Sequence, residues 1–274
     1  MKKRIKFLMG ADPEFVVKGK NNQIICADSL PLYSDNEFGA DGGGVAFELR
    51  PRPAYTPEKL VLNIKEAMQG GSLKEIVDAK WQAGSCHRMY NDYQDEVPIG
   101  GHIHFGTKGI ISPKKLIDFL DIYLGIPVSM ITNKTGRKNR LESGYGEYGD
   151  YRLQKWGVEY RTLSSWLISP KIAKAVLALA KVAAYECIKC NKTGYNKLIK
   201  NRHEYLDREG FYISTIISKI KKFKLYKKYK KDINIIFSMI KRKKTWASRT
   251  NIRNSWKIKF KKVNKKLNIQ ELII

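Results

Sequence analysis

No stretch of the sequence is apolar for long. The 274 residues contain no run approaching the roughly 18 consecutive apolar residues that a membrane-spanning helix requires, so we expect no transmembrane segment. The chain begins with basic residues, but the apolar run after Lys6 is interrupted by Asp12. We therefore expect no signal peptide either.

Cysteine is also scarce. The hydrophobic content of 43% and the charged content of 28% are ordinary for a globular protein, which needs no covalent scaffold at this length. The cysteines are too few and too scattered to form one: Cys26, Cys86, Cys187 and Cys190. We therefore expect reduced thiols and a cytoplasmic protein.

Acidic residues are half as numerous as basic ones, 26 against 52. Residues 181–274 hold 27 of the lysines and arginines but 6 of the acidic residues. We therefore predict a boundary near residue 190, with one domain over 1–190 and a basic, mainly helical extension over 191–274. Such an extension could bind nucleic acid through its phosphates, but solvated helix faces are the favoured explanation of the lysines.

Helix and strand patterns alternate along the first 190 residues. Hydroxyl residues followed by proline mark helix starts at Thr56, Ser112 and Ser169, and each leads into an apolar stripe at helical spacing. Short apolar segments predict strands over 6–18, 23–27, 45–50, 80–83, 103–106, 152–155 and 158–167. This pattern predicts an α+β fold with a largely antiparallel sheet.

Four of the apolar segments carry two polar residues spaced two apart. In a strand, residues i and i+2 point to the same face, so each pair lies on one face and its apolar neighbours on the other. If the strands share a sheet, these carboxylates, imidazoles and guanidiniums gather on one open face. The pairs are Asp12 and Glu14, Glu48 and Arg50, His102 and His104, and Glu159 and Arg161.

The carboxylates of these pairs indicate either metal ligation or ion pairing. A buried carboxylate needs a partner, because burying a charge alone is costly. Hard divalent cations favour oxygen ligands, and we favour a metal at Asp12 and Glu14 for that reason. Cross-strand ion pairs with Arg50 or Arg161 would also satisfy them, and a Glu–Arg ladder is an equal alternative for Glu48.

The two histidines form the most specific of the four motifs, within Gly100-Gly101-His102-Ile103-His104-Phe105-Gly106. Histidines at this spacing can reach one metal ion or one nucleotide, and the flanking glycines allow close approach of a ligand. A histidine pair without any ligand is the alternative. Zinc stays open on the pair alone, although no cysteine or third histidine follows at a suitable spacing.

Three arginines fall in one segment, close to Tyr145 and Glu159 in the sequence. Arginine binds phosphate and carboxylate groups through two parallel hydrogen bonds. A single arginine would more often form a surface ion pair, whereas three beside an acidic and histidine-bearing face indicate charge handling in phosphoryl transfer. They are Arg140, Arg152 and Arg161.

The segment Gly144-Tyr145-Gly146-Glu147-Tyr148-Gly149 matches the dinucleotide-binding pattern GxGxxG. No strand precedes it directly, and a predicted strand rather than a helix follows, so we do not expect it to bind a dinucleotide. The segments 84–99 and 132–150 contain many polar and glycine residues. They are candidate lids over a site.

In their order along the chain, these motifs resemble those of the carboxylate–amine ligase superfamily, which includes glutamine synthetase and glutamate–cysteine ligase. They are most similar to its phage-associated COOH–NH2 ligase (amidoligase) group. The resemblance covers about residues 5–170 and depends on the segments 10–15, 47–51, 101–104 and 159–161. It implies an antiparallel sheet curved into a partial barrel, with helices on its outer face and substrates on the concave one.

The resemblance also implies an ATP-dependent ligase that joins a carboxylate to an amine through an acyl phosphate. The ligands of Mg²⁺ or Mn²⁺ would be Asp12, Glu14, Glu48, His102 and Glu159. Catalytic roles would belong to Arg152, Arg161 and His104. Phosphate or substrate would contact Arg50, Arg140, Tyr145 and Gly101.

Some features depart from the family pattern. Asp12 stands where a longer glutamate is common, no third acid is evident near Glu48, and residues beyond about 190 have no recognised counterpart. Two other functions stay open. One is a nucleic-acid-binding protein with an inactive ligase-like domain, and the other a metal-dependent hydrolase using His102 and His104. The phage-associated resemblance points to the cytoplasm of an infected bacterial host.

Overall fold

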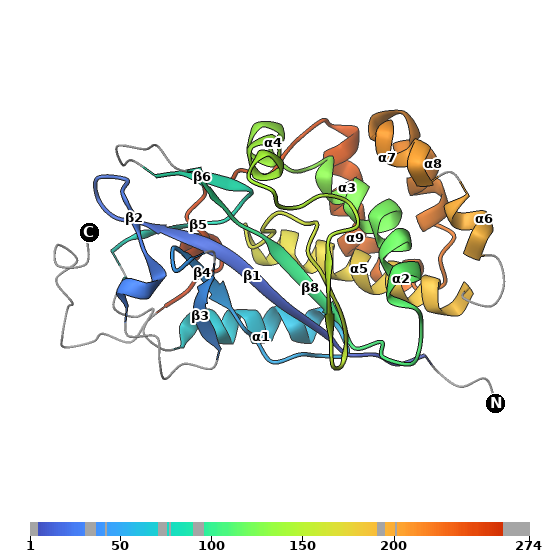
Figure 1. Cartoon of the computed structure of the whole chain (residues 1–274), viewed down its shortest axis with the longest axis horizontal. Helices are drawn as coiled ribbons and strands as arrows, with labels where there is room; N and C mark the ends of the chain where they lie inside the picture. Colours follow the sequence, from blue (N-terminus) through green and yellow to red (C-terminus); the bar gives the residue numbers. More distant parts are fainter. Residues whose placement is uncertain are drawn as a thin grey trace.

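The computed structural model describes residues 5–30, 37–41, 43–70, 76, 78–89, 96–190, 195–200 and 202–259. Its centre is a curled antiparallel sheet of eight strands that forms half a barrel (Figure 1). The predicted α+β class with a curved, largely antiparallel sheet is therefore confirmed. The strands are β1 (Met9–Lys18), β2 (Ile24–Ile25), β3 (Phe38–Asp41), β4 (Ala46–Leu49), β5 (Lys80–Gln82), β8 (Gly101–Phe105), β9 (Tyr151–Gln154) and β10 (Gly157–Tyr160).

Strand β1 is the longest and pairs with four others. Its first five residues pair with β8, and Glu14 and Phe15 pair with β4. Its last three residues pair with β5, and two of these also pair with β2. Strand β10 continues the sheet beyond β8, and β9 forms its edge. Side chains from β4 and β8 therefore meet around the middle of β1.

Alternation along the strands gives the sheet one apolar and one polar face. Ala11 and Phe15 of β1, Ile103 and Phe105 of β8 and Tyr160 of β10 are buried in one hydrophobic cluster. Burial of this face removes large apolar side chains from water, which is the main favourable term in folding. The residues between them carry the polar pairs and point to the opposite face.

Helices cover the apolar face (Figure 1). Helix α1 (Pro57–Gln69) begins where the sequence predicts, because the Thr56 hydroxyl accepts a hydrogen bond from the Lys59 N–H at 3.3 Å and Pro57 occupies the first turn. Beside it lies the long α5 (Pro170–Cys190), whose residues 172–187 are almost all buried. The layer continues with α2 (Pro113–Leu120), a π-helical stretch over Asp121–Gly125, α3 (Ile126–Ser129) and α9 (Tyr226–Lys241).

Helix α4 (Lys134–Glu142) lies outside this layer, in the segment 132–150 that the sequence analysis treats as a loop. It has no apolar stripe, since Arg140 is its one buried residue, and the sequence therefore shows no helical periodicity there. The Asn133 side chain caps it by accepting a hydrogen bond from the Gly136 N–H at 2.9 Å. The other loop candidate, 84–99, contains the hairpin of β6 (Cys86–Arg88) and β7 (Glu96–Pro98), while residues 90–95 lie outside the described chain.

Strand β10 is shorter than the predicted strand 158–167. It ends at Tyr160, after which Arg161 bonds to the Asp150 carbonyl and Ser164 forms an isolated bridge with Gly100. The chain thus leaves the sheet and crosses back toward the start of β8. The apolar run beyond 161 is buried against the core rather than extended in the sheet.

Beyond residue 194 the chain forms further helices that pack on the same core. Ile216, Ile220 and Trp256 belong to the same hydrophobic cluster as α1 and α5. The Trp256 indole donates to the Leu167 carbonyl at 2.7 Å, and the Gln82 amide donates to the Arg249 carbonyl at 3.0 Å. The division at residue 190 stays a prediction. The helices are α6 (Tyr195–Ile199), α7 (Arg202–Asp207), α8 (Glu209–Ile220), α9 and α10 (Ile252–Ser255).

None of the helices in the described part of the chain is long and apolar enough to cross a bilayer.

Lys181 provides a test of the helix layer, because it is a cation in the buried part of α5. Its Nζ donates to the Phe7 carbonyl at 3.0 Å and lies 3.5 Å from the centre of the Phe7 ring. Burial lowers the pKa of Lys181 from 10.5 to about 8, so the unfolded chain binds more protons than the folded one between these pH values. Stability contributed by this site therefore rises as pH increases from 8 to 10.5.

We expect Lys181→Met to raise the free energy of unfolding at pH 7 by up to about 3 kcal/mol, the size implied by the lowered pKa. The advantage of the variant over wild type should shrink toward pH 10, where the wild-type lysine is neutral. Urea unfolding at both pH values measures this difference. An advantage that does not change with pH would contradict it.

Candidate active site

The polar face of the sheet brings the residue pairs together. Asp12 lies opposite His102 and Glu14 opposite Glu48, while Glu159 lies opposite His104 on one side and Arg152 on the other. These residues come from β1, β4, β8, β9 and β10, which are far apart in the sequence. The antiparallel register alone therefore collects oxygen, imidazole and guanidinium groups in one place.

One cluster contains three acids, Glu14, Asp41 and Glu48, with a carboxylate oxygen from each lying within 4.8 Å of the others. The Gly100 N–H donates to Glu14 at 2.7 Å, and Arg50 Nε donates to Glu48 at 2.6 Å. Burial and the nearby Asp41 raise the pKa of Glu14 well above its ordinary value, against the effect of the Gly100 hydrogen bond. Burial and the charge of Asp12 raise the pKa of Glu48 to about 7.

These raised pKa values have a clear physical cause: the acids crowd negative charge in a poorly solvated place. A divalent cation would relieve this cost, and carboxylate oxygens are the ligands that Mg²⁺ and Mn²⁺ prefer. The donor set of the cluster thus fits a hard cation.

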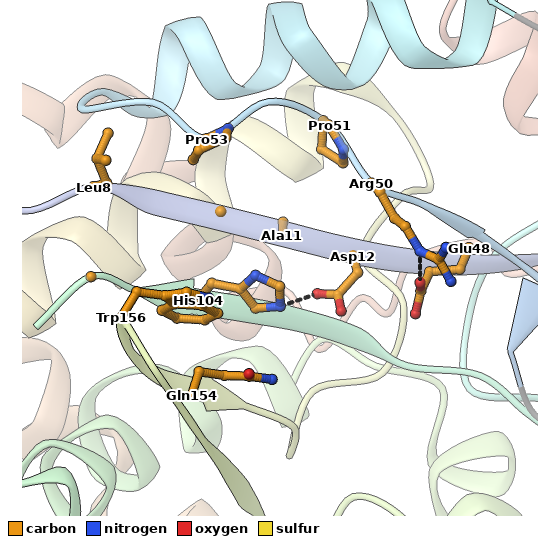
Figure 2. A pocket seen from close by; sticks show the side chains of 12 residues that line it. Leu8, Ala11, Asp12, Glu48, Arg50, Pro51, Pro53, His104, Gln154 and Trp156 are labelled. Carbon is orange, nitrogen blue, oxygen red and sulfur yellow. Dashed lines mark hydrogen bonds and ion pairs between the residues drawn. The ribbon is translucent and has the colours of Figure 1, made fainter. Parts of the chain in front are cut away.

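A second cluster consists of Asp12, His104 and Glu159, whose ligand atoms also lie within 4.8 Å of one another. Asp12 forms a hydrogen-bonded ion pair with His104 Nε2 (Figure 2). Burial acts to raise the pKa of Asp12, but the hydrogen bond and charge of His104 outweigh it and hold the pKa below its ordinary value. The other side of the His104 ring faces Trp156, with 4.9 Å between ring centres.

His102 lies between the two clusters. Its Nε2 is 3.7 Å from a Glu14 oxygen and its Nδ1 is 3.6 Å from a Glu159 oxygen. Burial lowers the pKa of His102 to about 4, so the imidazole is neutral at pH 7 and keeps one nitrogen lone pair. It could therefore serve as a metal ligand for either cluster.

Glu159 is held by positive and polar groups on its outer side. Arg161 Nε and Arg152 Nη1 lie 3.4 and 3.7 Å from its oxygens, and Gln154 donates to it at 3.0 Å. The second cluster therefore carries less net negative charge than the first. Arg161 also reaches the Asp150 carboxylate at 3.9 Å.

Arg140 of α4 is 3% exposed, and none of its ion pairs among the described residues is within 4.0 Å, although the charges of Glu14 and Asp150 act to raise its pKa. Its guanidinium donates to the carbonyls of Thr162 and Arg161 at 3.1 and 3.2 Å. Burial lowers the pKa of Arg140 to about 10, which leaves it charged at neutral pH. A buried cation whose described hydrogen-bond partners are carbonyls is well suited to an anionic ligand.

The glycines of the GxGxxG match explain how Arg140 is enclosed. Gly144, Gly146 and Gly149 all have positive φ, between 82° and 90°. A Cβ on Gly146 would overlap the Arg140 guanidinium, so the loop closes over this side chain only because residue 146 is glycine. The segment is a turn around an arginine, consistent with the expectation that it does not bind a dinucleotide.

Two cavities flank the line of acids and histidines. The first, which we call the arginine cavity, has a volume of about 580 Å³ and is lined by Glu14, Asp41, Arg140, Tyr145, Arg152 and Arg161. The second, the tryptophan groove, has a volume of about 560 Å³ and is lined by Leu8, Asp12, Pro51, Pro53, His104 and Trp156. Figure 2 shows the prolines on one wall of this groove and Trp156 beside His104 on the other. The acids therefore separate a cationic compartment from an apolar, aromatic one.

Comparison with known protein families agrees with this geometry. A model of the phage phiEco32-like COOH.NH2 ligase-type 2 family matches residues 9–258. The chain belongs to this COOH–NH2 ligase family. The match includes α6 to α10, so the C-terminal helices have a counterpart in the family, and the expectation of none beyond about residue 190 was wrong. No curated protein matches the chain.

Several solved structures are similar to this chain. A glutamate–cysteine ligase from Francisella tularensis in complex with AMP has a TM-score of 0.54 at 12% identity, covering 87% of this chain and 82% of that one. A bifunctional glutathione synthetase from Pasteurella multocida has a TM-score of 0.49 at 10% identity, covering 87% and 46%. This chain therefore spans under half of the bifunctional synthetase. A glutamine synthase homologue has a TM-score of 0.40 at 11% identity, covering 86% and 70%.

Most site residues expected from the sequence lie on this face of the sheet. Gly101 is placed differently, since it does not line the two cavities described above. Its carbonyl accepts a hydrogen bond from the Trp166 indole at 2.8 Å, and a Cβ there would overlap that ring. Arg50 lines the tryptophan groove, on the other side of the acids from Arg140.

Asp41 and Trp156 are the residues that the sequence analysis missed. Asp41 supplies the third acid beside Glu48 that the sequence analysis could not locate. In the sequence, Asp41 is followed by three glycines, which indicate a turn between two paired strands. In the structure, β3 and β4 pair so that Gly39 lies opposite Glu48, and Asp41 is two residues from Gly39 on the same face. Trp156 stands out only as an exposed aromatic residue in a turn.

We expect Mg²⁺ or Mn²⁺ to raise the thermal midpoint of unfolding of this protein by roughly 5–10 °C at a hundredfold excess over Kd. Asp41→Asn should reduce the rise to less than half, because it removes an oxygen ligand that lies beside Glu14 and Glu48. Glu58→Gln, a partly exposed acid in the first turn of α1, is the control and should retain it. A wild-type midpoint that neither cation moves in scanning fluorimetry would contradict the assignment.

Proposed function

We propose that this protein uses ATP to join a carboxylate and an amine through an acyl-phosphate intermediate. Its membership in the COOH–NH2 ligase family supports the ligase class. The observation that carries the proposal is the line of acids and histidines between two cavities of different chemistry. Such an arrangement suits a reaction in which a polyphosphate must meet a second anionic reactant.

The residues that would hold Mg²⁺ or Mn²⁺ are the two clusters and the histidine between them. When bound, the cations would neutralise phosphate charge and orient the γ-phosphoryl group. Glu14, Asp41 and Glu48 would form the more negatively charged cation site, and Asp12 and Glu159 would belong to the other. His102 is neutral and reaches toward both, whereas His104 is already paired with Asp12.

The nucleotide would occupy the tryptophan groove. Its prolines, Leu8 and the exposed Trp156 offer an apolar surface on which a purine can stack. From there the phosphates would extend over Asp12 and Glu48 toward the arginines. Arg50, at the border of the groove, is placed to contact a phosphate.

The carboxylate substrate would occupy the arginine cavity. Arg140 and Tyr145 are placed to hold its charge, while Arg152 and Arg161 reach toward Glu159 and the phosphoryl group. Removing water from this cavity would strengthen these interactions and protect a reactive intermediate from hydrolysis.

The reaction would proceed in two steps. A carboxylate oxygen attacks the γ-phosphorus of ATP, the bond to the β-phosphate oxygen breaks, and ADP and an acyl phosphate form. Arg152 and Arg161 stabilise the charge on the transferring oxygens. The amine nitrogen then attacks the acyl carbon, phosphate leaves, and the nitrogen loses a proton to give the amide.

We expect purified wild-type protein with Mg²⁺ to release ADP when offered the right pair from a panel of amino acids and muropeptides. Glu48→Gln and His102→Ala should lower the rate by about 10²-fold or more, because they remove candidate metal ligands. Glu58→Gln should retain it. Cleavage of an ester, phosphate or amide substrate without nucleotide would favour a metal-dependent hydrolase instead. Salt-sensitive nucleic-acid binding without ATP use would favour an inactive ligase-like domain.

Trp156 allows nucleotide binding to be measured apart from catalysis. It is 40% exposed, while the remaining tryptophans are buried: Trp81, Trp166, Trp246 and Trp256. We expect Mg·ATP to quench the tryptophan fluorescence of wild type, and Mg·tripolyphosphate, which has no base, to leave it unchanged. Trp156→Ala should raise the KM for ATP about tenfold, the value of one stacking contact, with little change in kcat. Quenching that persists in Trp156→Phe would contradict a base in this groove.

A further inference from the structure

Helices α7 and α8 contact α4 and the loop 143–150, which together form one wall of the arginine cavity. Glu209, the first residue of α8, accepts hydrogen bonds from Arg137 Nη2 at 2.8 Å and from Arg137 Nη1 at 3.2 Å. It also accepts one from the Tyr148 hydroxyl at 2.7 Å. Arg137 lies on α4 one turn before Arg140, and Tyr148 lies in the loop 143–150 that closes over Arg140. One carboxylate therefore joins both parts of the wall.

A second contact anchors the end of the same loop. Asp121 is fully buried and accepts hydrogen bonds from the Tyr160 hydroxyl at 2.9 Å and the Gly149 N–H at 3.1 Å. Arg202 of α7 neutralises it with a hydrogen bond of 2.6 Å. Tyr160 is the residue of β10 between Glu159 and Arg161. The loop, the strand and the C-terminal region thus share one buried charge.

Arg140 lies between these two anchors. The Tyr145 N–H donates to the Arg140 carbonyl at 3.1 Å, and Gly146 packs against its guanidinium. Among the described residues, its guanidinium is held by the carbonyls of Arg161 and Thr162, in the segment that follows β10. The position of its charge in the cavity therefore depends on how α4 and the loop are held.

We propose that Glu209 and Arg202 are positioning residues for the arginine cavity. They act through Arg137, Tyr148 and Asp121, and they hold α4 and the loop 143–150 so that Arg140 and Tyr145 are ordered before an anion binds. Preordering removes the entropic cost of fixing the loop at the moment of binding. The segment 132–150 is then a clamped wall rather than a mobile lid. That the anion is a reacting carboxylate or phosphate depends on the proposed function.

The clamp is tested directly by hydrogen exchange. In Glu209→Ala we expect amides of 143–150 to exchange about tenfold faster, because three hydrogen bonds to a charged group are lost. Exchange in β1 and β8 should not change. Glu209→Gln keeps an oxygen that can accept from Tyr148 and should give an intermediate rate. Asp207→Ala, an exposed acid at the end of α7, is the control and should match wild type.

Binding and kinetics show whether the clamp acts on the anion. We expect Glu209→Ala to weaken binding of inorganic phosphate, measured by calorimetry, by about tenfold. It should raise the KM for the carboxylate substrate by a similar factor and leave the KM for ATP and the Trp156 quenching unchanged. If wild type shows no turnover, the proposed function fails, and the phosphate and exchange measurements still decide on the clamp.

Tyr148→Phe is the second variant, since it removes one hydroxyl and keeps the packed ring. It should accelerate exchange in 143–150 as well. Added to Glu209→Ala it should have little further effect, because the two side chains form one contact. Unchanged exchange at 143–150 in Tyr148→Phe, or equal loss of affinity for phosphate and ATP in Glu209→Ala, would overturn the proposal.

Discussion

The register of β1 against β4 and β8 is the constraint on which the rest depends. It sets Glu14 opposite Glu48 and thereby brings acids together at a cost that their raised pKa values record. The apolar face supplies the compensation. Phe15, the neighbour of Glu14, stacks on Phe47 and Trp81 with ring centres 5.5 and 5.3 Å apart. A slip by one residue would expose Phe15 and bury Glu14 in the core, so packing on one face enforces the site on the other.

The site is divided into two compartments. The acids lie along the middle of the sheet, and each end of this line is completed by a different kind of structure. At one end, the hairpin of β9 and β10 presents Trp156, and the chain after β4 adds its prolines. At the other, α4 and its loop bring Arg140 over the sheet, and contacts from α7 and α8 fix them. The family match through residue 258 fits this dependence on the C-terminal helices.

Part of this arrangement could be predicted from the sequence. The four polar pairs are visible because strand periodicity is local, and the helix at Thr56 is visible because its capping residues adjoin it. Asp41 was missed because its place beside Glu48 depends on the pairing of β3 with β4. Strand β3 has four residues, two of them Gly and Ala, and such a short segment does not reveal a strand in the sequence. The depth of Arg140 was hidden for a similar reason: α4 has no apolar stripe, and its burial comes from a loop and from the segment after β10.

The central claim is that carboxylates from separate strands share cations that hold a nucleotide. Crystals grown with Mn²⁺ and a non-hydrolysable ATP analogue test it most directly, because manganese is located by its anomalous scattering. We expect manganese within bonding distance of Glu14, Asp41 and Glu48, with the analogue's base against Trp156. Manganese bound elsewhere, or an analogue whose phosphates lie away from these acids, would contradict it.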